Sequence, residues 1–460
     1  MKQKNYINMS IFDIFKIGPG PSSSHTLGPM KAGNRFRAYV ESLDSSVLKN
    51  ISKLKIELHG SLSATGKGHG THRAITAGVM GMTPELCNPD EVLELFTKAN
   101  KIYNIKFKNF SVEFQESDIC FCPILDSVNF PFANTLILKL QDSSSNTLVE
   151  KEYYSIGGGF ITCKDEQEPA RGEAKYLYSN FSELREIVER KNISLSQIMV
   201  ENEMAITGLS FEEIKAKLKS LVDVMLKSVK NGLKSKEEFL PGSLMLRRRA
   251  KEVYNSASSK KHIMNKYLIY LNSYALAASE ENAAGKIVVT APTSGSSGLI
   301  PAIMYFLKHN MGEKKMAIVE AILAASAVGF VAKTNASIAG AEVGCQGEIG
   351  VAAAMGAALM ASINKEPIHI VESSATIALE HQLGLTCDPI GGYVQVPCIE
   401  RNAAGALEGY NSYFLAFSQH KNILSFDEVV QTMLETGRDM NSKYKETAKG
   451  GLATIASVRC

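Results

Sequence analysis

The 460-residue chain has no tryptophan and no long block of one charge sign. Lysine and arginine number 50 and aspartate and glutamate number 47, so the net charge is only +3. A nucleic-acid partner gains no support from this balance, because phosphate binding requires a concentrated basic face. The 45% hydrophobic and 21% charged residues exclude wholesale disorder. A chain of this length predicts two or three domains.

Long uncharged apolar segments are also missing. Residues 349–364 are rich in alanine and glycine but fall short of the ~20 residues that a membrane span needs, so we expect a buried helix there. The N-terminus starts basic, but Asp13 and Lys16 interrupt the apolar stretch that follows, and no small-residue cleavage site comes after it. We therefore expect a cytoplasmic protein with no secretory signal and no membrane partner.

Strand patterns dominate the first 160 residues. Apolar and polar residues alternate in 54–58 and 110–115, as half-buried strands require. Segments 135–140 and 147–156 flank a polar stretch that is typical of a hairpin loop. A helix is expected over 90–102. Residues 1–160 are therefore predicted to form an α+β domain.

Helical patterns follow. Ser210-Phe211-Glu212-Glu213 is a capping-box sequence that opens an apolar-periodic helix, and Ser425-Phe426-Asp427-Glu428 opens another. Segments 321–332 and 349–363 are apolar almost all round, which is typical of central helices. The polar run 161–175 is predicted as a linker, and 176–460 as a mostly α-helical domain with a C-terminal tail.

A loop rich in hydroxyl groups precedes the first long helix. Its glycines and prolines are followed by Ser22, Ser23, Ser24, His25 and Thr26. Free amides and hydroxyls at a helix start bind anions such as carboxylates, which makes this loop a candidate anion site. The alternative is a serine helix cap after a turn, which would account for only one of the serines.

A second glycine-rich loop spans residues 65–72. Lys67 offers positive charge, and His69, with glycine on both sides, offers a base near neutral pH. The loop is not a phosphate-binding Walker A motif, because glycine follows the lysine where a hydroxyl residue is needed. The alternative is a flexible turn with exposed histidines. His59, in phase with the preceding strand, is expected to pack.

A third loop of this kind spans residues 290–298 and contains Thr293 and Ser294. Its hydroxyls could bind a carboxylate or an ammonium group, or simply cap the helix that begins near Leu299.

The eight cysteines of a cytoplasmic chain are expected to be thiols. Three of them lie in helix-breaking turns next to glycine or proline: Cys345, Cys387 and Cys398. Thiolates from three loops could hold an iron–sulfur cluster with one iron incompletely ligated, although their spacing matches neither zinc knuckles nor bacterial ferredoxins. Zinc, or no metal at all, stays an alternative. The cysteines expected to be small buried packing residues are Cys87, Cys120, Cys122 and Cys163.

Together these segments resemble the iron–sulfur-dependent bacterial L-serine dehydratases (L-serine ammonia-lyases) of the single-chain form. The resemblance covers nearly the whole chain. It is carried by residues 10–15, 20–30, 65–69, 154–160, 280–285, 340–348, 380–381, 383–389, 395–402 and 435–441.

The resemblance implies a [4Fe–4S] cluster held by Cys345, Cys387 and Cys398. Its fourth iron would act as a Lewis acid on the β-hydroxyl of L-serine, while His69 removes the α-proton. The aminoacrylate that forms would give pyruvate and ammonia. Cys460, otherwise dismissed as an end thiol, would cap the fourth iron until substrate displaces it.

The family also implies the substrate-binding residues: the loop from Ser22 to Thr26, which would bind the substrate carboxylate, with Lys67, Thr293 and Ser294. The N-terminal domain resembles a regulatory domain of phosphoglycerate dehydrogenases, and residues 176–460 would form the all-α catalytic domain. The enzymes of the family are typically homodimers.

Several positions depart from the family pattern. Ser294 stands where asparagine is usual, His72 where aspartate is usual, and Phe132 where a histidine is expected. Ser296 and Ser297 stand in place of an alanine and a cysteine. We therefore expect dehydration to persist with an altered affinity or preference among β-hydroxy amino acids.

Two rival functions stay open at this point. A pyridoxal-phosphate dehydratase needs a Schiff-base lysine and a phosphate-binding glycine loop, for which Lys333 and residues 157–159 are the candidates. A non-catalytic iron–sulfur redox sensor would explain the cysteines but would leave loops 22–26 and 65–69 without a function.

Overall fold

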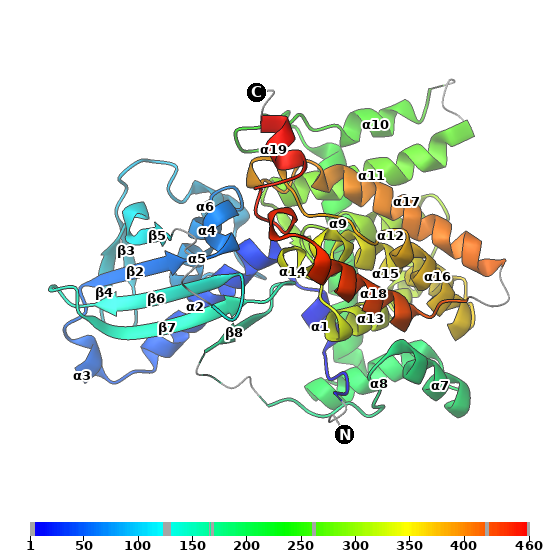
Figure 1. The fold of residues 1–460 in the computed structure, drawn as a ribbon, viewed down its shortest axis with the longest axis horizontal. Helices are drawn as coiled ribbons and strands as arrows, with labels where there is room; N and C mark the ends of the chain where they lie inside the picture. The colour runs from blue at the N-terminus through cyan, green and yellow to red at the C-terminus, as the bar shows by residue number, and fades with distance from the viewer. Residues whose placement is uncertain are drawn as a thin grey trace.

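The computed structural model describes residues 5–122, 130–164, 166, 170–259, 264–418 and 423–457. Figure 1 shows two parts side by side, one built on a sheet and the other built of helices. An α+β region followed by a mostly α-helical region was the predicted fold class, and it is confirmed.

A five-stranded sheet forms the centre of the first part. Its order is β5 (Ile119–Phe121), β2 (Lys53–Leu58), β6 (Thr135–Gln141), β7 (Thr147–Ser155) and β8 (Ile161–Cys163). β5 runs parallel to β2, and the other neighbours are antiparallel. Alternate residues of β2 are buried, as its sequence pattern predicts. β3 (Tyr103–Lys106) and β4 (Ser111–Phe114) form a separate hairpin.

Two expectations for this part need correction. The helix expected over 90–102 is only α6 (Pro89–Glu94), and Phe96 adopts a φ of 58°, which an α-helix excludes. The sheet also extends into the segment 161–175 that was predicted as a linker. Residues Ile161 to Cys163 return beside β7 after a turn of three glycines with positive φ at 157–159.

The second part is a bundle in which the two apolar helices predicted to be central are buried. The capping boxes at Ser210 and Ser425 are formed as predicted. The helices are α7 (Phe181–Lys191), α8 (Leu195–Thr207), α9 (Phe211–Lys234), α10 (Ala250–Ser256), α11 (Lys266–Ala283), α12 (Leu299–His309), α13 (Lys315–Asn335), α14 (Gly340–Val343), α15 (Ile349–Ile363), α16 (Ile368–Glu380), α17 (Cys398–Phe417), α18 (Phe426–Asp439) and α19 (Leu452–Ser457).

Helix α13 is long and apolar enough to cross a membrane by length and composition alone. Within its apolar window, 78% of the residues are buried inside the protein, where α13 packs on α15. This burial is what a core helix requires, because an all-round apolar surface must be covered on every side.

The start of the chain ties the two parts together. Helix α1 (Ile11–Ile14) lies in the core of the helical part, and Ile7 and Phe15 are buried there as well. β1 (Ile17–Pro19) then pairs antiparallel with β9 (Ile287–Val289). The hydroxyl-rich loop that follows β1 therefore begins at the junction of the two parts.

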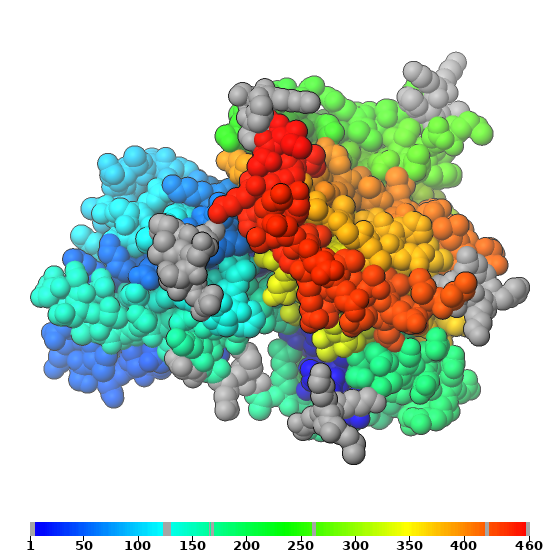
Figure 2. Space-filling model, viewed as in Figure 1, coloured from blue at the N-terminus to red at the C-terminus, as the bar shows by residue number. Residues whose placement is uncertain are grey.

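The end of the chain lies across the same junction. Residues after α18, drawn red, run over the surface between the sheet part and the bundle (Figure 2). Lys445 forms a parallel bridge with Cys387, and the Ser61 hydroxyl, from the first part, donates to the carbonyl of Glu446 at 3.0 Å.

A close helix crossing sets the two N-terminal loops side by side. α2 (Gly28–Glu41) follows the loop that holds Ser22, and α5 (Thr71–Val79) follows the loop that holds His69. A Cβ added at Gly78 would lie 2.1 Å from the carbonyl oxygen of Met30, and one added at Gly33 would lie 2.4 Å from that of Ile75. Only glycine allows this approach at either position.

The substitution Gly78→Ala is expected to lower the melting temperature. In a helix free of such contacts this change would stabilise by about 1 kcal/mol, but overpacking against a backbone carbonyl costs about 1–3 kcal/mol. Gly329→Ala in α13 is the matched control, because a Cβ there would meet side-chain atoms and no backbone, those of Met355 at 3.2 Å and of Ile14 at 3.4 Å. Thermal unfolding followed by circular dichroism tests this, and a higher melting temperature for Gly78→Ala would contradict the crossing.

Candidate active site

Three cysteines from distant parts of the bundle line one cavity. Cys345 lies in the turn between α14 and α15, Cys387 follows α16, and Cys398 is the first residue of α17. One ligand atom from each of Cys345, Cys387 and Glu348 lies within 4.8 Å of the others. Cys398 lines the same cavity but is not part of that close group. Cys460 lies outside the described residues.

The thiols of this cavity are costly to ionise. A hydrogen bond with Cys345, followed by burial, holds the pKa of Cys387 far above its usual range. Burial, and then the nearby Cys345, does the same to the pKa of Cys398. Arg401 lies beside the sulfurs, with its guanidinium donating to the Thr386 carbonyl at 2.6 Å.

The donor set fits an iron–sulfur cluster. Two buried thiols, Cys345 and Cys387, and the half-buried thiol of Cys398 line one cavity and give soft sulfur ligands, the kind that such clusters use. A bound metal removes the thiol protons that burial otherwise retains. With only three sulfurs from the described residues, one position of a four-iron cluster would be open to another ligand.

His69 reaches the same cavity from the first part of the chain. Its Nδ1 lies 3.1 Å from the Thr65 carbonyl oxygen, which can only accept, so Nδ1 carries the proton. Nε2 is buried and has no hydrogen-bond partner among the described residues. Burial, with a smaller contribution from His25, lowers the pKa of His69 well below its usual value. The imidazole is therefore neutral, with a free lone pair on Nε2.

The loop from Ser22 to Thr26 surrounds His69 and is buried throughout. Thr26 Oγ1 donates to the His69 carbonyl at 2.9 Å, and the ring centroids of His25 and His69 lie 4.4 Å apart. Ser22 accepts from the His25 amide at 3.2 Å and is the residue of this loop that lines the cysteine cavity. Ser23 is buried beside it. The loop thus positions His69 and offers one hydroxyl to the cavity.

His25 is held inside this loop with both ring nitrogens engaged. Nδ1 lies 2.8 Å from Ser24 Oγ, and Nε2 lies 3.1 Å from Ser61 Oγ and 3.0 Å from Thr65 Oγ1. Burial lowers the pKa of His25 to about 4. His25 is therefore neutral and saturated, which suits a positioning residue better than a substrate contact.

The loop at 290–298 borders the cavity through Gly295. The Thr293 hydroxyl donates a hydrogen bond to a carboxyl oxygen of Glu348, which is one of the residues that line the cavity. Ser294 is fully buried, and its hydroxyl has no partner among the described residues. Ser294 directly precedes Gly295, so this departure from the family pattern adjoins a residue that lines the cavity.

The other two departures lie elsewhere. His72 is packed between Phe96 and Phe121, with ring centroids 5.8 and 5.9 Å away, and burial lowers its pKa to about 4. Phe132 is partly exposed against Tyr154, with the ring centroids 5.1 Å apart. Neither lines the cysteine cavity among the described residues.

A second, polar cavity of about 240 Å³ adjoins the first, because His69 and Val394 line both. Lys67 and Arg73 line it and provide positive charge. Lys67 is exposed, whereas the Nε of Arg73 is buried and unpartnered among the described residues. Lys67 therefore lies on the approach to His69 and not beside the cysteines.

Sequence reasoning missed Arg73, Glu348 and Glu446. Arg73 directly follows the 65–72 loop and lies four residues after His69, a position that the loop motif could have signalled. Burial raises the pKa of both Glu348 and Glu446, so each carboxyl favours its neutral form. Glu446 lies 3.5 Å from His25 Nδ1 and lines the cysteine cavity, but no local pattern marks it.

The tail is fixed beside Cys387. The amide of Leu452, the first residue of α19, donates to Asp388 Oδ2 at 2.7 Å. A Cβ added at Gly451 would lie 2.2 Å from the same oxygen. Helix α19 therefore starts next to Asp388, the residue that follows Cys387 in the sequence.

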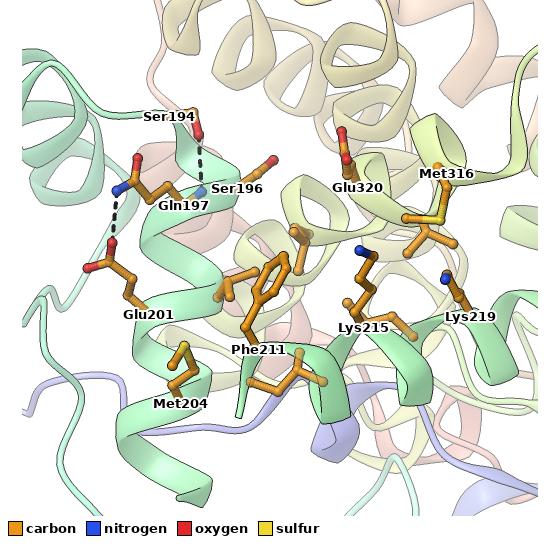
Figure 3. A pocket seen from close by; sticks show the side chains of 15 residues that line it. Ser194, Ser196, Gln197, Glu201, Met204, Phe211, Lys215, Lys219, Met316 and Glu320 are labelled. Atoms are coloured by element: carbon orange, nitrogen blue, oxygen red, sulfur yellow. Dashed lines mark hydrogen bonds between the residues drawn. The ribbon is translucent and has the colours of Figure 1, made fainter. Parts of the chain in front are cut away.

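A larger cavity, of about 790 Å³, lies away from this site between α8, α9 and α13. Figure 3 shows its lining, with Phe211 and Met204 among polar side chains such as Gln197 and Glu201. Among its described lining residues there is neither a thiol nor an imidazole. Its chemistry does not fit the elimination expected from the sequence.

The pyridoxal-phosphate candidates also lie away from the cysteines. Lys333 Nζ lies 3.4 Å from the Ile156 carbonyl, next to the glycine turn at 157–159, and 5.1 Å from the Phe160 ring centroid. Lys333 and this turn are absent from the residues that line the cysteine cavity.

Comparison with known proteins agrees with the geometry. The model of the serine dehydratase beta chain matches residues 10–166, and that of the serine dehydratase alpha chain matches residues 190–453. Similar proteins include L-serine dehydratase 2 of Escherichia coli strain K12, at 40% identity, and the L-serine dehydratases of Streptomyces coelicolor and Haemophilus influenzae, at 39% and 38%. Each alignment covers 97% of this chain and 98% of the relative. The chain therefore belongs to the serine dehydratase family and joins the regions of its beta and alpha chains in one polypeptide.

Proposed function

We propose that the protein is an L-serine ammonia-lyase that converts L-serine to pyruvate and ammonia, with a [4Fe–4S] cluster held by Cys345, Cys387 and Cys398. The observation that carries this proposal is one cavity lined by the three cysteines and by His69, whose Nε2 has no hydrogen-bond partner among the described residues. The relatives that match over nearly their full length are named L-serine dehydratases, which supports the substrate.

When bound, the cluster supplies a Lewis-acidic iron that makes the β-hydroxyl of serine a better leaving group. His69 is the base for the α-proton. Its Nδ1–H donates a hydrogen bond to the Thr65 carbonyl. The lone pair available for proton transfer is therefore on Nε2, in a residue that lines the cavity. Its lowered pKa keeps that lone pair unprotonated at neutral pH.

Substrate binding is assigned to charges and hydroxyls around His69. Lys67 and Arg73 in the adjoining cavity attract the carboxylate of serine, and the Ser22 hydroxyl is the polar group of its loop that lines the inner cavity. The Ser294 hydroxyl, buried without a described partner, is a further candidate donor. Buried walls exclude water from the α-proton until elimination is complete.

Loss of the α-proton and of the hydroxyl as water leaves 2-aminoacrylate. This enamine tautomerises to the imine and takes up one water to give pyruvate and ammonia, so the two water molecules cancel in the net reaction. The family's homodimer and the cytoplasmic location remain predictions.

We also propose that Cys460 caps the cluster in the resting enzyme. The support is the anchoring of Gly451 and Leu452 against Asp388, next to Cys387. Cys460 follows Leu452 by 460 − 452 = 8 residues, a length that an extended chain spans over about 26 Å.

Removing a cluster ligand is expected to abolish both iron binding and activity. Cys345→Ala should lose about four irons per chain and all pyruvate formation, because a buried cluster cannot be held by two thiolates. Cys460→Ala is the contrast variant, since it should keep the iron but lose it faster in air. Anaerobic purification with iron, sulfide and pyruvate assays measures both. A colourless, metal-free protein with full activity would refute the cluster.

His69→Ala is expected to keep its iron and lose turnover. The loss of a general base lowers kcat by about 10²–10⁴-fold, while the cysteines are untouched. His309→Ala, on α12 far along the chain, is the control and should keep normal kcat. Iron retained together with normal turnover in His69→Ala would exclude His69 as the base. Iron without turnover in the unmodified protein would favour the redox sensor.

Arg73→Gln is expected to raise KM for L-serine by about 10- to 100-fold, the range for a lost hydrogen bond to a charged group. Iron content should be unchanged. Lys67→Gln should have a smaller effect, because an exposed charge is screened by water. Arg247→Gln serves as the control, since its exposed ion pairs with Glu238 and Glu252 lie outside both cavities. An unchanged KM in Arg73→Gln would remove it from the substrate site.

A further inference from the structure

Four potential ligands meet on the outer face of the sheet, away from the candidate active site. β2 and β5 pair in parallel with Glu57 opposite Cys120 and Leu58 opposite Phe121, which sets His59 opposite Cys122. Leu58 and Phe121 face the core. Because side chains alternate along strands, Glu57, His59, Cys120 and Cys122 share the opposite face.

This placement corrects the expectation that Cys120 and Cys122 are small buried packing residues. Cys120 is exposed and Cys122 is only half-buried. Two neighbouring thiols, an imidazole and a carboxylate on an exposed face do not form an apolar core. These groups are the ligands that zinc sites use.

The distances suit a single tetrahedral ion. Ligand atoms of Glu57, His59 and Cys122 all lie within 4.8 Å of one another, and Glu57 Oε2 lies 3.5 Å from His59 Nε2. The Sγ atoms of Cys120 and Cys122 are 3.1 Å apart. Zinc bonds of about 2.0–2.3 Å place neighbouring tetrahedral ligands about 3.3–3.8 Å apart. Glu57, His59 and Cys122 are already gathered, whereas Cys120 contacts this group through Cys122 and must turn its thiol toward the ion.

A buried imidazole nitrogen that makes no hydrogen bond to a described residue, and whose ion-pair partner Glu57 lies 3.5 Å away, points to a missing ligand at this place. His59 Nε2 is buried from solvent and has no hydrogen-bond partner among the described residues. Its ring packs on Phe130, with centroids 4.7 Å apart. Glu57 binds Lys139 through Oε1 at 2.7 Å, which leaves Oε2 on the side of His59. Lys139 also balances part of the negative charge that two thiolates and a carboxylate would add.

A disulfide between the two cysteines fits less well. Residues i and i+2 of an extended strand have Cα atoms about 6.6 Å apart, at the upper limit of the ~4.4–6.8 Å range of disulfides. The observed Sγ separation of 3.1 Å is also far above a bond of about 2.05 Å.

We propose that Glu57, His59, Cys120 and Cys122 form a second metal site that binds one Zn²⁺ ion. The ion links the edge strand β5 to β2. Ser61 follows the end of β2 by three residues, and its hydroxyl forms hydrogen bonds with His25 and with the Glu446 carbonyl. The ion would therefore also stabilise the strand that leads into the His69 loop. This site is independent of the cluster and does not rest on the proposed reaction.

Metal analysis of the anaerobically purified full-length protein tests the site. We expect about one zinc per chain in addition to iron, and loss of that zinc in Cys120→Ser/Cys122→Ser with iron retained. Cys87→Ser, which removes a buried thiol of the same part of the chain, should keep the zinc. Cys345→Ala should lose iron but keep zinc, so a failure of the cluster and a failure of this site give different results.

Cobalt provides a second measurement that does not depend on what is bound at purification. Co²⁺ added to zinc-stripped protein should saturate at one equivalent with a thiolate charge-transfer band, which His59→Ala weakens and the double cysteine variant removes. The proposal is overturned if purified protein holds no zinc and cobalt gives no such band. It is equally overturned if zinc persists in the double variant, or if Cys120 and Cys122 resist alkylation until reduced.

Discussion

The antiparallel pairing of β1 with β9 is the contact on which the arrangement of the candidate site depends. With α1 buried in the helical core just before it, this pairing fixes the point at which the chain leaves the bundle to build the sheet. The Ser22 loop follows directly, and the α2–α5 crossing then sets His69 beside it. The cavity is lined by thiols from the helical part and by an imidazole from the part of the chain that follows this pairing.

The cavity gathers ionisable groups whose charged forms are unfavourable in this buried setting. Buried thiols, a neutral histidine and two protonated carboxyls all avoid charge in a setting that water does not screen. A cationic cofactor changes this balance, because it allows the sulfurs to ionise while the base stays neutral. The same burial that keeps these groups uncharged leaves Nε2 of His69 without a proton, as the proposed base requires.

Local sequence patterns predicted what depends on neighbouring residues. The α+β then α order, the capping boxes at Ser210 and Ser425, and the buried central helices all follow from periodicity and caps. The patterns failed where distant contacts decide. The segment 90–102 looked helical, but the left-handed Phe96 ends the helix, and 161–163 became an edge strand because β7 was there to pair with it.

In the candidate site, too, local patterns predicted single loops and residues, whereas distant contacts determine how they come together. Hydroxyls, glycines and turn-borne cysteines marked three loops and three thiols, but no pattern could show that they share one cavity. Glu446 carries no signal, since its place results from the tail crossing the junction. Cys120 and Cys122 were misjudged because their exposure depends on β5 lying at the edge of the sheet, although their separation by two residues already placed them on one face.

The threading of residues 7–15 through the helical core has a consequence for the architecture of the family. The matched models are described as beta and alpha chains, names that imply two polypeptides. If the backbone were cut between the matched regions, the amino-terminal fragment would still contact the helical part in two ways. The side chains of Ile7, Ile11, Ile14 and Phe15 would pack in the helical core, and β1 would pair with β9. In this chain the two matched regions are therefore joined by packing and strand pairing as well as by the backbone.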